Sequence, residues 1–438
     1  MGYPGRVRLR AAITHFVVLC TFALVAALGM SALGCALFDG SSDPLVPSGS
    51  SPDAGSPGSS SAGTGAPRST TTVTVSRTVP PTPAQLILSK MNLRQKAAQT
   101  LLVAFDGETL LPSTEEIIAA GPPGGFLLLS RNVTGAAQLT SLTASLQEAA
   151  AGVEPGIGLL IAADQEGGTV QRIHSGVPRV PSARQLAEDS DTADAAKLAT
   201  ETAQGLLALG VNMNLAPVAD IVSDPDSFLY SRSYSGDPTV VVQFVEVVTA
   251  AFERNGLISV VKHFPGHGSA PEDSHGQPAI ATASQVDFAK IHLRPFKAAI
   301  AGGVEGVMVG HLIVEAYDPD RSASTSIRVV DGLLREGLGF AGLIVCDDIE
   351  MAGAVAAPTN ATGANQGAGS ASTPAEIAVA ALAAGCDLVI CSGPVSDQTL
   401  VIDAIVEAVR SGAIPQYRLD DAVRHMLEIK LRHGLASP

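Results

Sequence analysis

The chain has no tryptophan among its 438 residues, and phenylalanine and tyrosine bring the aromatic fraction to only 4%. This scarcity excludes broad stacking platforms, so a sugar or other ring-shaped ligand has to be held mainly by polar and charged groups. Positive charge is scarce as well, because 27 Lys and Arg stand against 42 Asp and Glu and give a formal net charge of −15. A charge of this sign excludes nucleic acid as a general partner.

Cysteine is also rare, with five in the whole chain. Cys20 and Cys35 lie in an N-terminal leader, whereas Cys346, Cys386 and Cys391 lie inside apolar runs. We expect these last three to be small buried core residues rather than parts of a disulfide framework.

The N-terminus has the pattern of a secretory signal. A basic segment with three arginines precedes an apolar run over residues 11–28, and the residues Ser-Ala-Leu-Gly then lead to Cys35. This pattern predicts a lipoprotein signal peptide over residues 1–35, with the lipid attached to Cys35. The protein is then exported and anchored by lipid to the outer face of the cytoplasmic membrane. An uncleaved membrane anchor is the alternative.

Ser, Gly, Pro and Thr dominate residues 36–83, which carry almost no large apolar side chains. A segment of this composition cannot bury enough surface to fold and is predicted to be a disordered, flexible tether. The remaining residues, 84–438, are predicted to form a single catalytic domain.

From residue 84 onward, short apolar runs alternate with longer segments of helical pattern. Eight runs are predicted as strands: 99–105, 124–130, 158–164, 211–217, 257–264, 303–311, 342–348 and 386–393. Continuous apolar strands separated by helices are typical of a parallel sheet covered on both faces. Eight such units favour an α/β domain folded as a (β/α)₈ TIM-type barrel, with a doubly wound open sheet as the alternative. A capping box at 373–376 predicts where the helix before the last strand begins.

Polar residues gather at or near the C-terminal ends of the predicted strands: Asp164, Asn214, Lys262, His263, His311 and Asp347. In a barrel these ends converge on one face, where enzymes of this fold carry out their chemistry. The distribution therefore predicts one active site at that face.

Three of the polar residues outside the helices are candidates for ligand binding. Asp164 precedes a glycine turn, and a carboxylate there can accept hydrogen bonds from two adjacent sugar hydroxyls, although an ordinary turn is the alternative. Arg172, eight residues on, can support Asp164 or hold the same ligand. Arg232 lies in a polar loop after the fourth strand, where an isolated arginine is usually solvated.

The seventh strand ends in two consecutive carboxylates, Asp347 and Asp348. Because side chains alternate along a strand, we expect only one of them to point into the barrel mouth. Asp347 is the better candidate since it lies directly at the strand end, and Asp348 is then expected to face the helices or cap the following turn. The alternative is that both carboxylates cap the next helix.

The segment 262–275, KHFPGHGSAPEDSH, holds three of the nine histidines. His263, His267, Asp273 and His275 are types of residue that bind metals, but their spacing matches neither H-E-x-x-H nor a zinc-finger pattern. An acid–base site is the better interpretation. Asp273 lies two residues before His275, so its carboxylate can orient an imidazole that donates a proton to a leaving oxygen and later accepts one from water.

Several motifs in order, DQEGG, NMNLAPVAD, KHFPGHG…DSH and the CDD strand end, resemble the bacterial β-N-acetylhexosaminidases of glycoside hydrolase family 3. The resemblance extends over residues 84–435. It implies that Asp347 is the catalytic nucleophile, that His275 is the general acid/base and that Asp273 is its partner. It also implies a set of residues that hold the terminal N-acetylglucosamine: Asp164, Arg172, Arg232, Lys262 and His263.

The resemblance implies a retaining exo-β-N-acetylglucosaminidase that forms a covalent glycosyl-enzyme and acts on peptidoglycan fragments such as muropeptides. We expect no cofactor, no metal, a small carbohydrate as the partner and a monomer. Four alternatives stay open: a β-glucosidase or broad β-glycosidase, an N-acetylglucosamine phosphorylase, a metal-dependent hydrolase and a non-catalytic sugar-binding lipoprotein. One departure from the family is a Gly-rich insertion at 358–373, which is either a lid or a segment without a role.

Overall fold

In the computed structural model, which describes residues 80–355 and 372–438, eight parallel strands form a closed barrel in which chain neighbours are also neighbours in space. The barrel closes where the first strand pairs with the last, Leu101 opposite Val389. The strands are β1 (Leu101–Ala104), β2 (Gly125–Leu128), β3 (Leu160–Ala163), β6 (Met213–Asn214), β7 (Ile258–Phe264), β9 (Gly306–Val309), β12 (Leu343–Cys346) and β13 (Leu388–Cys391). Each lies within one of the eight predicted runs, so the barrel is confirmed and the open sheet is wrong.

The strands read as continuous apolar runs because both of their faces are buried. In β1, Leu102 belongs to the cluster inside the barrel, whereas its neighbours Leu101 and Val103 belong to the cluster between the barrel and the helices. Cys346, Cys386 and Cys391 are buried and free, as predicted. Polar side chains are thereby confined to the strand ends and the loops that follow them.

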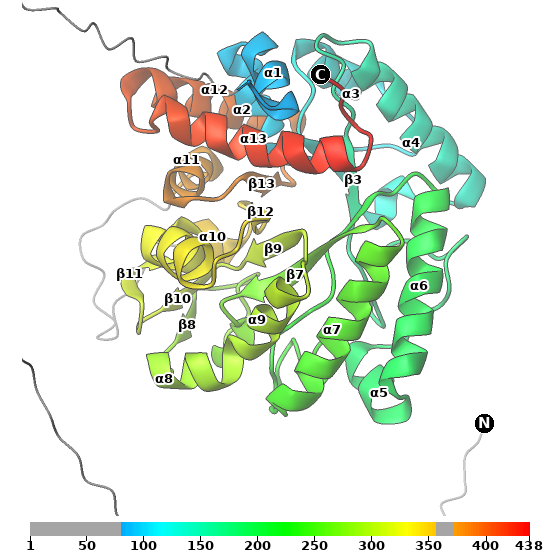
Figure 1. Cartoon of the computed structure of the whole chain (residues 1–438), viewed down its shortest axis with the longest axis vertical. Coiled ribbons are helices and arrows are strands. Elements are labelled where there is room, and N and C mark those ends of the chain that lie inside the picture. The colour runs from blue at the N-terminus through cyan, green and yellow to red at the C-terminus, as the bar shows by residue number, and fades with distance from the viewer. Residues whose placement is uncertain (1–79, 356–371) are drawn as a thin grey trace, which may run out of the picture. The chain divides into compact units, whose positions relative to one another are not determined.

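Helices surround the barrel (Figure 1). The α-helices are α1 (Pro83–Lys90), α2 (Leu93–Gln99), α3 (Pro112–Ala120), α4 (Ala136–Ala151), α5 (Ala183–Asp189), α6 (Thr192–Ala208), α7 (Pro238–Arg254), α8 (Gln285–Asp287), α9 (Arg294–Ala301), α10 (Ala352–Val355), α11 (Pro374–Ala384), α12 (Val395–Ser411) and α13 (Gln416–Arg432). Helix α11 begins with the predicted capping box, in which Thr373 and Glu376 bond to each other's backbone N–H. The described residues also form two π-helices, η3 (Phe288–His292) and η5 (Arg328–Gly337), and three 3₁₀ turns, η1 (Ser130–Asn132), η2 (His267–Ser269) and η4 (Ala323–Thr325).

Two small sheets lie outside the barrel. One is a hairpin of β4 (Gln165–Gly167) and β5 (Val170–Gln171), and the other contains β8 (Ala279–Ala281), β10 (Leu312–Val314) and β11 (Asp318–Ser322). The hairpin directly follows β3, and it replaces the simple glycine turn predicted there. It thereby carries side chains of residues 166–172 toward the end of the barrel where the strands finish.

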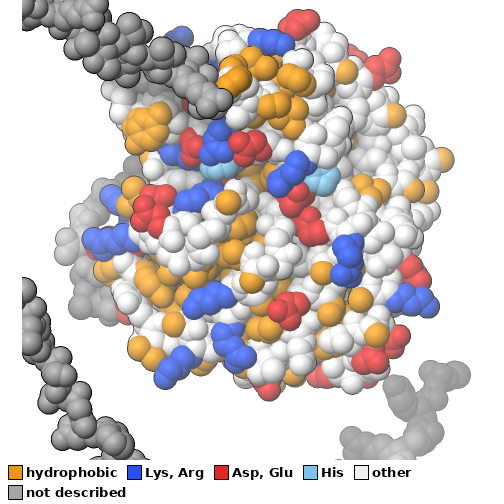
Figure 2. Space-filling view, in the orientation of Figure 1, with side chains coloured by type: hydrophobic (Ala, Val, Ile, Leu, Met, Phe, Trp, Pro, Cys, Tyr) orange, Lys and Arg blue, Asp and Glu red, His pale blue; other side chains and the backbone are white. Residues whose placement is uncertain are grey.

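Helix α13 closes the end of the barrel where the strands begin. Its Met426 and Ile429 belong to the same apolar cluster as the inward-facing strand residues. The approach is close at Gly124, where a Cβ atom would lie 2.3 Å from the Gln99 carbonyl oxygen and 2.9 Å from Met426 Cε. The outer side of α13 is charged, and Figure 2 shows Lys or Arg, Asp or Glu and histidine side chains gathered over it.

Lys430 of α13 is fully buried, and its ammonium donates to Gln99 Oε1 at 2.8 Å. Burial lowers the pKa of Lys430 from 10.5 to about 7. Between these two values the unfolded chain holds a proton that the folded chain lacks, so the free energy of unfolding rises with pH. From pH 7 to pH 9 we expect a rise of about 2 kcal/mol from this group.

Urea unfolding of wild type and Lys430→Met across pH 7 to 9 tests this expectation. The rise should be absent from Lys430→Met and retained in Lys90→Met, a lysine exposed on α1. An equal rise in wild type and Lys430→Met would show that Lys430 is charged in the folded protein.

Three sequence predictions, namely the signal peptide with Cys35, most of the tether and the insertion at 358–373 apart from its last two residues, lie outside the described residues. Among the helices of residues 80–355 and 372–438, none has the length and apolar character needed to cross a membrane.

Candidate active site

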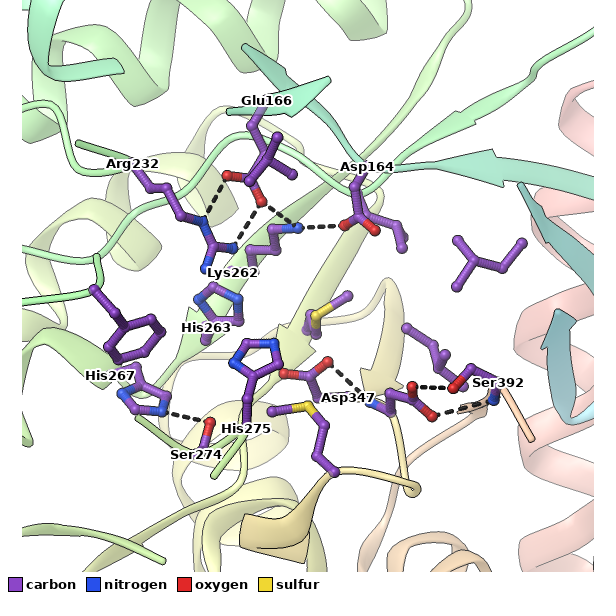
Figure 3. A pocket seen from close by; sticks show the side chains of 18 of the residues that line it. Asp164, Glu166, Arg232, Lys262, His263, His267, Ser274, His275, Asp347 and Ser392 are labelled. Atoms are coloured by element: carbon purple, nitrogen blue, oxygen red, sulfur yellow. Dashed lines mark hydrogen bonds and ion pairs between the residues drawn. The ribbon is translucent and has the colours of Figure 1, made fainter. Parts of the chain in front are cut away.

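A pocket of about 400 Å³ opens where the barrel strands end (Figure 3). This volume lies in the range of small-molecule sites, roughly 300–1,000 Å³. The barrel interior supplies its apolar lining, with Leu127, Leu215, Met308 and Ile390. All eight side chains predicted to form the site line this pocket: Asp164, Arg172, Arg232, Lys262, His263, Asp273, His275 and Asp347.

Four charged side chains form a chain of ion pairs along one wall. Lys262 Nζ lies 2.6 Å from Asp164 Oδ1 and 2.8 Å from Glu166 Oε1. Arg232 binds Glu166 with two nitrogens, Nε and Nη2, each at 2.8 Å. Burial by itself raises the pKa of Glu166, but Lys262 and Arg232 outweigh it and hold that pKa well below its usual range. Glu166 is therefore the buried anion that fixes both cations.

Arg172 lies next to these four residues. Asp164 and Arg172 are more exposed to the pocket than the others, with 18% and 31% of their side chains exposed. Arg172 Nη2 lies 3.8 Å from Asp164 Oδ2, beyond hydrogen-bonding distance. Among the described residues, Arg172 Nε is buried and has no hydrogen-bond partner. The exposed part of this guanidinium lines the pocket, where it can donate to a hydroxyl or carbonyl oxygen of a ligand, which is the role predicted for Arg172.

Asp220, after β6, orients the His263 ring. It is fully buried, its Oδ2 lies 2.7 Å from His263 Nδ1, and its Oδ1 accepts the backbone N–H of His267 at 2.6 Å. Burial by itself raises the pKa of Asp220, but His263 and His267 outweigh it and lower that pKa. The ionised carboxylate therefore holds Nδ1 of His263 and leaves Nε2 for a ligand in the pocket.

Asp347 and Asp348 follow β12, and both line the pocket. Asp347 Oδ1 accepts the backbone N–H of Asp348 at 2.8 Å. Burial by itself raises the pKa of Asp347, but the imidazoles of His263 and His311 outweigh it and lower that pKa. Asp347 is therefore ionised, as a nucleophile requires.

The prediction that only one of these carboxylates faces the barrel mouth is wrong. Asp348 caps the following turn, as expected, by accepting the backbone N–H of Glu350 at 3.2 Å, but it also lies at the pocket wall beside Ser392. The reason is that β12 ends at Cys346, so the alternation of side chains no longer applies to residues 347 and 348.

Asp273 and His275 lie on the loop after η2, at the rim of the pocket. Asp273 Oδ1 lies 2.7 Å from His275 Nδ1 and also accepts the backbone N–H of His275 at 2.9 Å. Burial by itself raises the pKa of Asp273, but the hydrogen bonds to His275 together outweigh it and lower that pKa. More than half of the His275 side chain, 58%, is exposed. With Nδ1 held by Asp273, Nε2 is the nitrogen that can exchange a proton with a substrate.

The four residues considered as metal ligands do not share one centre. Asp273 and His275 bond to each other, while His263 Nδ1 bonds to Asp220 and His267 Nε2 bonds to Ser274. In the described part of the chain, no group of three or more His, Cys, Asp or Glu is arranged to hold a metal ion.

Two of the six polar strand-end residues do not line the pocket. The amide of Asn214 bonds to the backbone of Gln165, through Oδ1 to its N–H and through Nδ2 to its carbonyl. His311 Nδ1 lies 2.8 Å from Ser324 Oγ, and its Nε2 lies 3.0 Å from the Asp348 carbonyl oxygen. Both side chains hold neighbouring segments of the chain in place. A polar residue at a strand end therefore lies at the predicted face of the barrel, but the sequence does not tell whether it lines the pocket or supports it.

Several side chains that shape the site are not among the residues predicted from the sequence. Glu166 and Asp220 lie in the DQEGG and NMNLAPVAD motifs without a predicted role, and His267 is predicted only as a possible metal ligand. The sequence holds a weak signal, because both carboxylates lie two or three residues after a predicted strand, and a buried carboxylate needs a cationic or N–H partner. Ser274 and Phe228 carried no such signal.

The fold and the pocket together define a class: a (β/α)₈-barrel enzyme with carboxylate and imidazole groups gathered at the C-terminal ends of its strands. Residues 92–429 match the family model described as the glycosyl hydrolase family 3 N terminal domain. The chain belongs to glycosyl hydrolase family 3.

Known proteins similar to this chain agree with that assignment. The β-hexosaminidase of Nitrosomonas eutropha is 34% identical over 331 residues, which are 73% of this chain and 89% of that protein. A glycoside hydrolase family 3 β-N-acetylglucosaminidase from Paenibacillus is 34% identical with a TM-score of 0.71, and the match covers 80% of this chain and 64% of that one. The β-N-acetylhexosaminidase of Beutenbergia cavernae is 30% identical with a TM-score of 0.66, covering 78% and 98%. The predicted family, barrel and enzyme class are confirmed, and the chain is a glycoside hydrolase.

Proposed function

We propose that the protein is a retaining exo-β-N-acetylglucosaminidase. The observation that carries this proposal is the presence in one pocket of an ionised strand-end carboxylate, Asp347, and the hydrogen-bonded pair of Asp273 and His275. A nucleophile and a separate proton donor are the two groups that a double-displacement mechanism requires. The similar proteins are named β-hexosaminidase, β-N-acetylglucosaminidase and β-N-acetylhexosaminidase, which supports N-acetylglucosamine as the sugar that is removed.

In the first step, a carboxylate oxygen of Asp347 attacks the anomeric carbon of the terminal sugar. The bond from that carbon to the leaving oxygen breaks, and the oxygen takes a proton from Nε2 of His275. The carboxylate of Asp273 stabilises the imidazolium before transfer and holds the ring through Nδ1. The products are a glycosyl-enzyme ester on Asp347 and the free aglycone.

In the second step, water attacks the same carbon from the face that the leaving group vacated. Nε2 of His275 now accepts a proton from the water, the ester bond breaks, and Asp347 leaves as a carboxylate. Two inversions at one carbon give net retention of configuration.

The terminal sugar is held by the charged wall. Asp164 accepts hydroxyl hydrogens, Arg172 and the remaining N–H groups of Lys262 and Arg232 donate to oxygens, and His263 contributes Nε2. The floor of the pocket is the apolar top of the barrel core, so a chain of sugars cannot pass through it. A closed pocket of this kind supports removal of one sugar from a chain end.

We propose cell-wall fragments such as muropeptides as the substrate, and a cell-envelope location with a lipid on Cys35. Among the described residues that line the pocket, Phe228 is the single phenylalanine, tyrosine or tryptophan. A pocket with a single aromatic side chain offers little stacking surface, which suits a short soluble fragment better than a crystalline polymer.

Assays of the full-length chain with chromogenic β-N-acetylglucosaminide and β-glucoside test the proposal. We expect turnover of the N-acetylglucosaminide. The N-acetylglucosamine should be released with the β configuration of the substrate, because the reaction proceeds with net retention. We expect kcat/KM for the glucoside to be lower by at least roughly 100-fold, because a site that hydrogen-bonds an N-acetyl group leaves polar groups unpaired on a substrate that lacks it. EDTA should leave the rate unchanged.

Three outcomes would contradict the proposal in different ways. Loss of turnover with EDTA would indicate a metal-dependent hydrolase, and N-acetylglucosamine 1-phosphate formed in phosphate buffer would indicate a phosphorylase. Equal rates on both substrates would indicate a broad β-glycosidase.

A further inference from the structure

Ser274 stands between the two residues of the acid/base pair but differs from both in its surroundings. Only 2% of Ser274 is exposed, whereas 45% of the Asp273 side chain and 58% of the His275 side chain are exposed. The loop is therefore buried at its middle residue, and the side chains of Asp273 and His275 extend from it on either side.

The first contact that holds Ser274 comes from the turn after β7. His267 Nε2 lies 2.8 Å from Ser274 Oγ, and His267 is itself 2% exposed. The backbone N–H of His267 donates to Asp220 Oδ1 at 2.6 Å, so the turn that carries the imidazole rests on a fully buried carboxylate. The hydroxyl of Ser274 is thus connected to the barrel frame through two buried polar groups.

The second contact comes from the segment that follows the nucleophile. The backbone N–H of Gly353 in α10 donates to the Ser274 carbonyl oxygen at 2.8 Å. The approach is so close that a Cβ atom at Gly353 would lie 2.6 Å from that oxygen and 3.0 Å from Ser274 Cβ. Because α10 begins five residues after Asp347, Ser274 is held by both segments that bear the proposed catalytic groups.

An aromatic contact completes the support. The Phe228 ring, on the loop after β6, lies edge-on to the rings of His267 and His275, with centroids 5.3 Å and 6.1 Å away. Burial lowers the pKa of His267, so its neutral ring can donate from Nε2 to the serine hydroxyl without a buried charge.

We propose that Ser274 and His267 are positioning residues, which hold the loop of Asp273 and His275 where His275 can protonate the leaving group. This inference rests on the proposed function, because it assumes that His275 is the general acid. Both residues line the pocket, but the hydrogen bond between His267 Nε2 and Ser274 Oγ occupies the polar atoms that join them, and neither is assigned a step in the reaction. Their removal should therefore act only through the position of His275, where a displacement of about 1 Å can cost roughly 100-fold in rate.

The expected signature is a dependence on the leaving group. A poor leaving group such as a sugar hydroxyl needs the proton from His275, whereas a dinitrophenolate departs without it. For Ser274→Ala and His267→Ala we expect kcat/KM on an N-acetylglucosaminyl disaccharide to fall roughly 10- to 100-fold, and on the dinitrophenyl glycoside to change less than about threefold. His267→Gln, which keeps an N–H donor near the serine, should recover much of the loss.

The test measures both substrates with full-length wild type, Ser274→Ala, His267→Ala, His267→Gln, His275→Ala and Ser269→Ala. Ser269 is a matched control because its hydroxyl bonds only locally, to the Gly266 carbonyl at 2.6 Å. Thermal unfolding of each variant separates a local effect from a loss of fold. We expect His275→Ala to lose much more kcat/KM on the disaccharide than on the dinitrophenyl glycoside. Ser274→Ala and His267→Ala should show the same difference between the two substrates, but a smaller one.

Two results would overturn the inference alone. Equal losses on both substrates would show a general structural role, and unchanged rates in Ser274→Ala beside a selective His275→Ala would show that the loop holds its position without the serine. If His275→Ala itself shows no dependence on the leaving group, the proposed general acid is wrong and the positioning role falls with it.

Discussion

Asp347→Asn is expected to lower kcat by roughly 10⁴-fold or more on every N-acetylglucosaminide, including those with excellent leaving groups. The reason is that an amide oxygen is a poor nucleophile and cannot form the glycosyl ester on which both steps depend. The side chain keeps its size, and its oxygen can still accept the backbone N–H of Asp348. The loss should therefore appear in kcat, while the protein stays folded and still binds its product.

Steady-state kinetics of Asp347→Asn and Asp347→Ala, with Asp348→Asn as the neighbouring control, provide the measurement. Asp348 bonds to the Ser392 and Glu350 backbone N–H groups through an oxygen that asparagine retains, so its variant should lose less than about tenfold. Mass spectrometry of wild type with a fluorinated N-acetylglucosaminide should place the trapped sugar on the peptide that contains Asp347. Label on another peptide, or a larger loss in Asp348→Asn, would remove Asp347 from the nucleophile role.

Glu166→Gln is expected to lower the free energy of unfolding by about 3 to 5 kcal/mol, since it removes one partner of a buried ion pair and leaves the other charged. Only 5% of the Glu166 side chain is exposed, and it is held by Lys262 and Arg232. The same change removes the ion pair that fixes Arg232 and leaves Lys262 paired with Asp164 alone. We therefore also expect KM for the N-acetylglucosaminide to rise.

Urea unfolding gives the free energy, and Glu428→Gln is the matched control. Glu428 pairs with Arg424 one turn away on α13, where 43% and 31% of the side chains are exposed. An exposed pair of this kind contributes little, so the control should lose less than about 0.5 kcal/mol. Similar small losses of unfolding free energy in Glu166→Gln and Glu428→Gln would show that the stability of the pocket wall does not depend on the charge of Glu166.

The barrel could be predicted from the sequence because each strand is a short apolar run, for the physical reason that both faces of a barrel strand are buried. Leu101, Leu102 and Val103 show the effect, since consecutive residues pack into different clusters and all three must be apolar. The position of Asp347 could be predicted for the complementary reason, because a charge directly after such a run has to lie at the barrel mouth.

The supporting contacts could not be predicted in the same way. Asn214 and His311 carry the same kind of signal as Asp164 and His263, yet they bond to loops rather than face the pocket. Whether such a side chain faces the pocket or bonds to a neighbouring segment depends on the path of the chain after each strand. Short hairpins such as β4–β5 determine that path, and they leave no periodic pattern in the sequence. Ser274 is the extreme case, because nothing in a serine between two polar residues indicates that it is buried.

The pairing of β1 with β13 has a consequence for the order of folding. The two strands come from opposite ends of the domain, and the contact between Gln99 and Lys430 joins residues 331 positions apart. Until the last strand has been synthesised, β1 has an apolar edge with no partner, and such edges are sites of aggregation. Closure of the ring is therefore a late, long-range event, and a chain shortened at its C-terminus should accumulate as insoluble protein rather than as a smaller active enzyme.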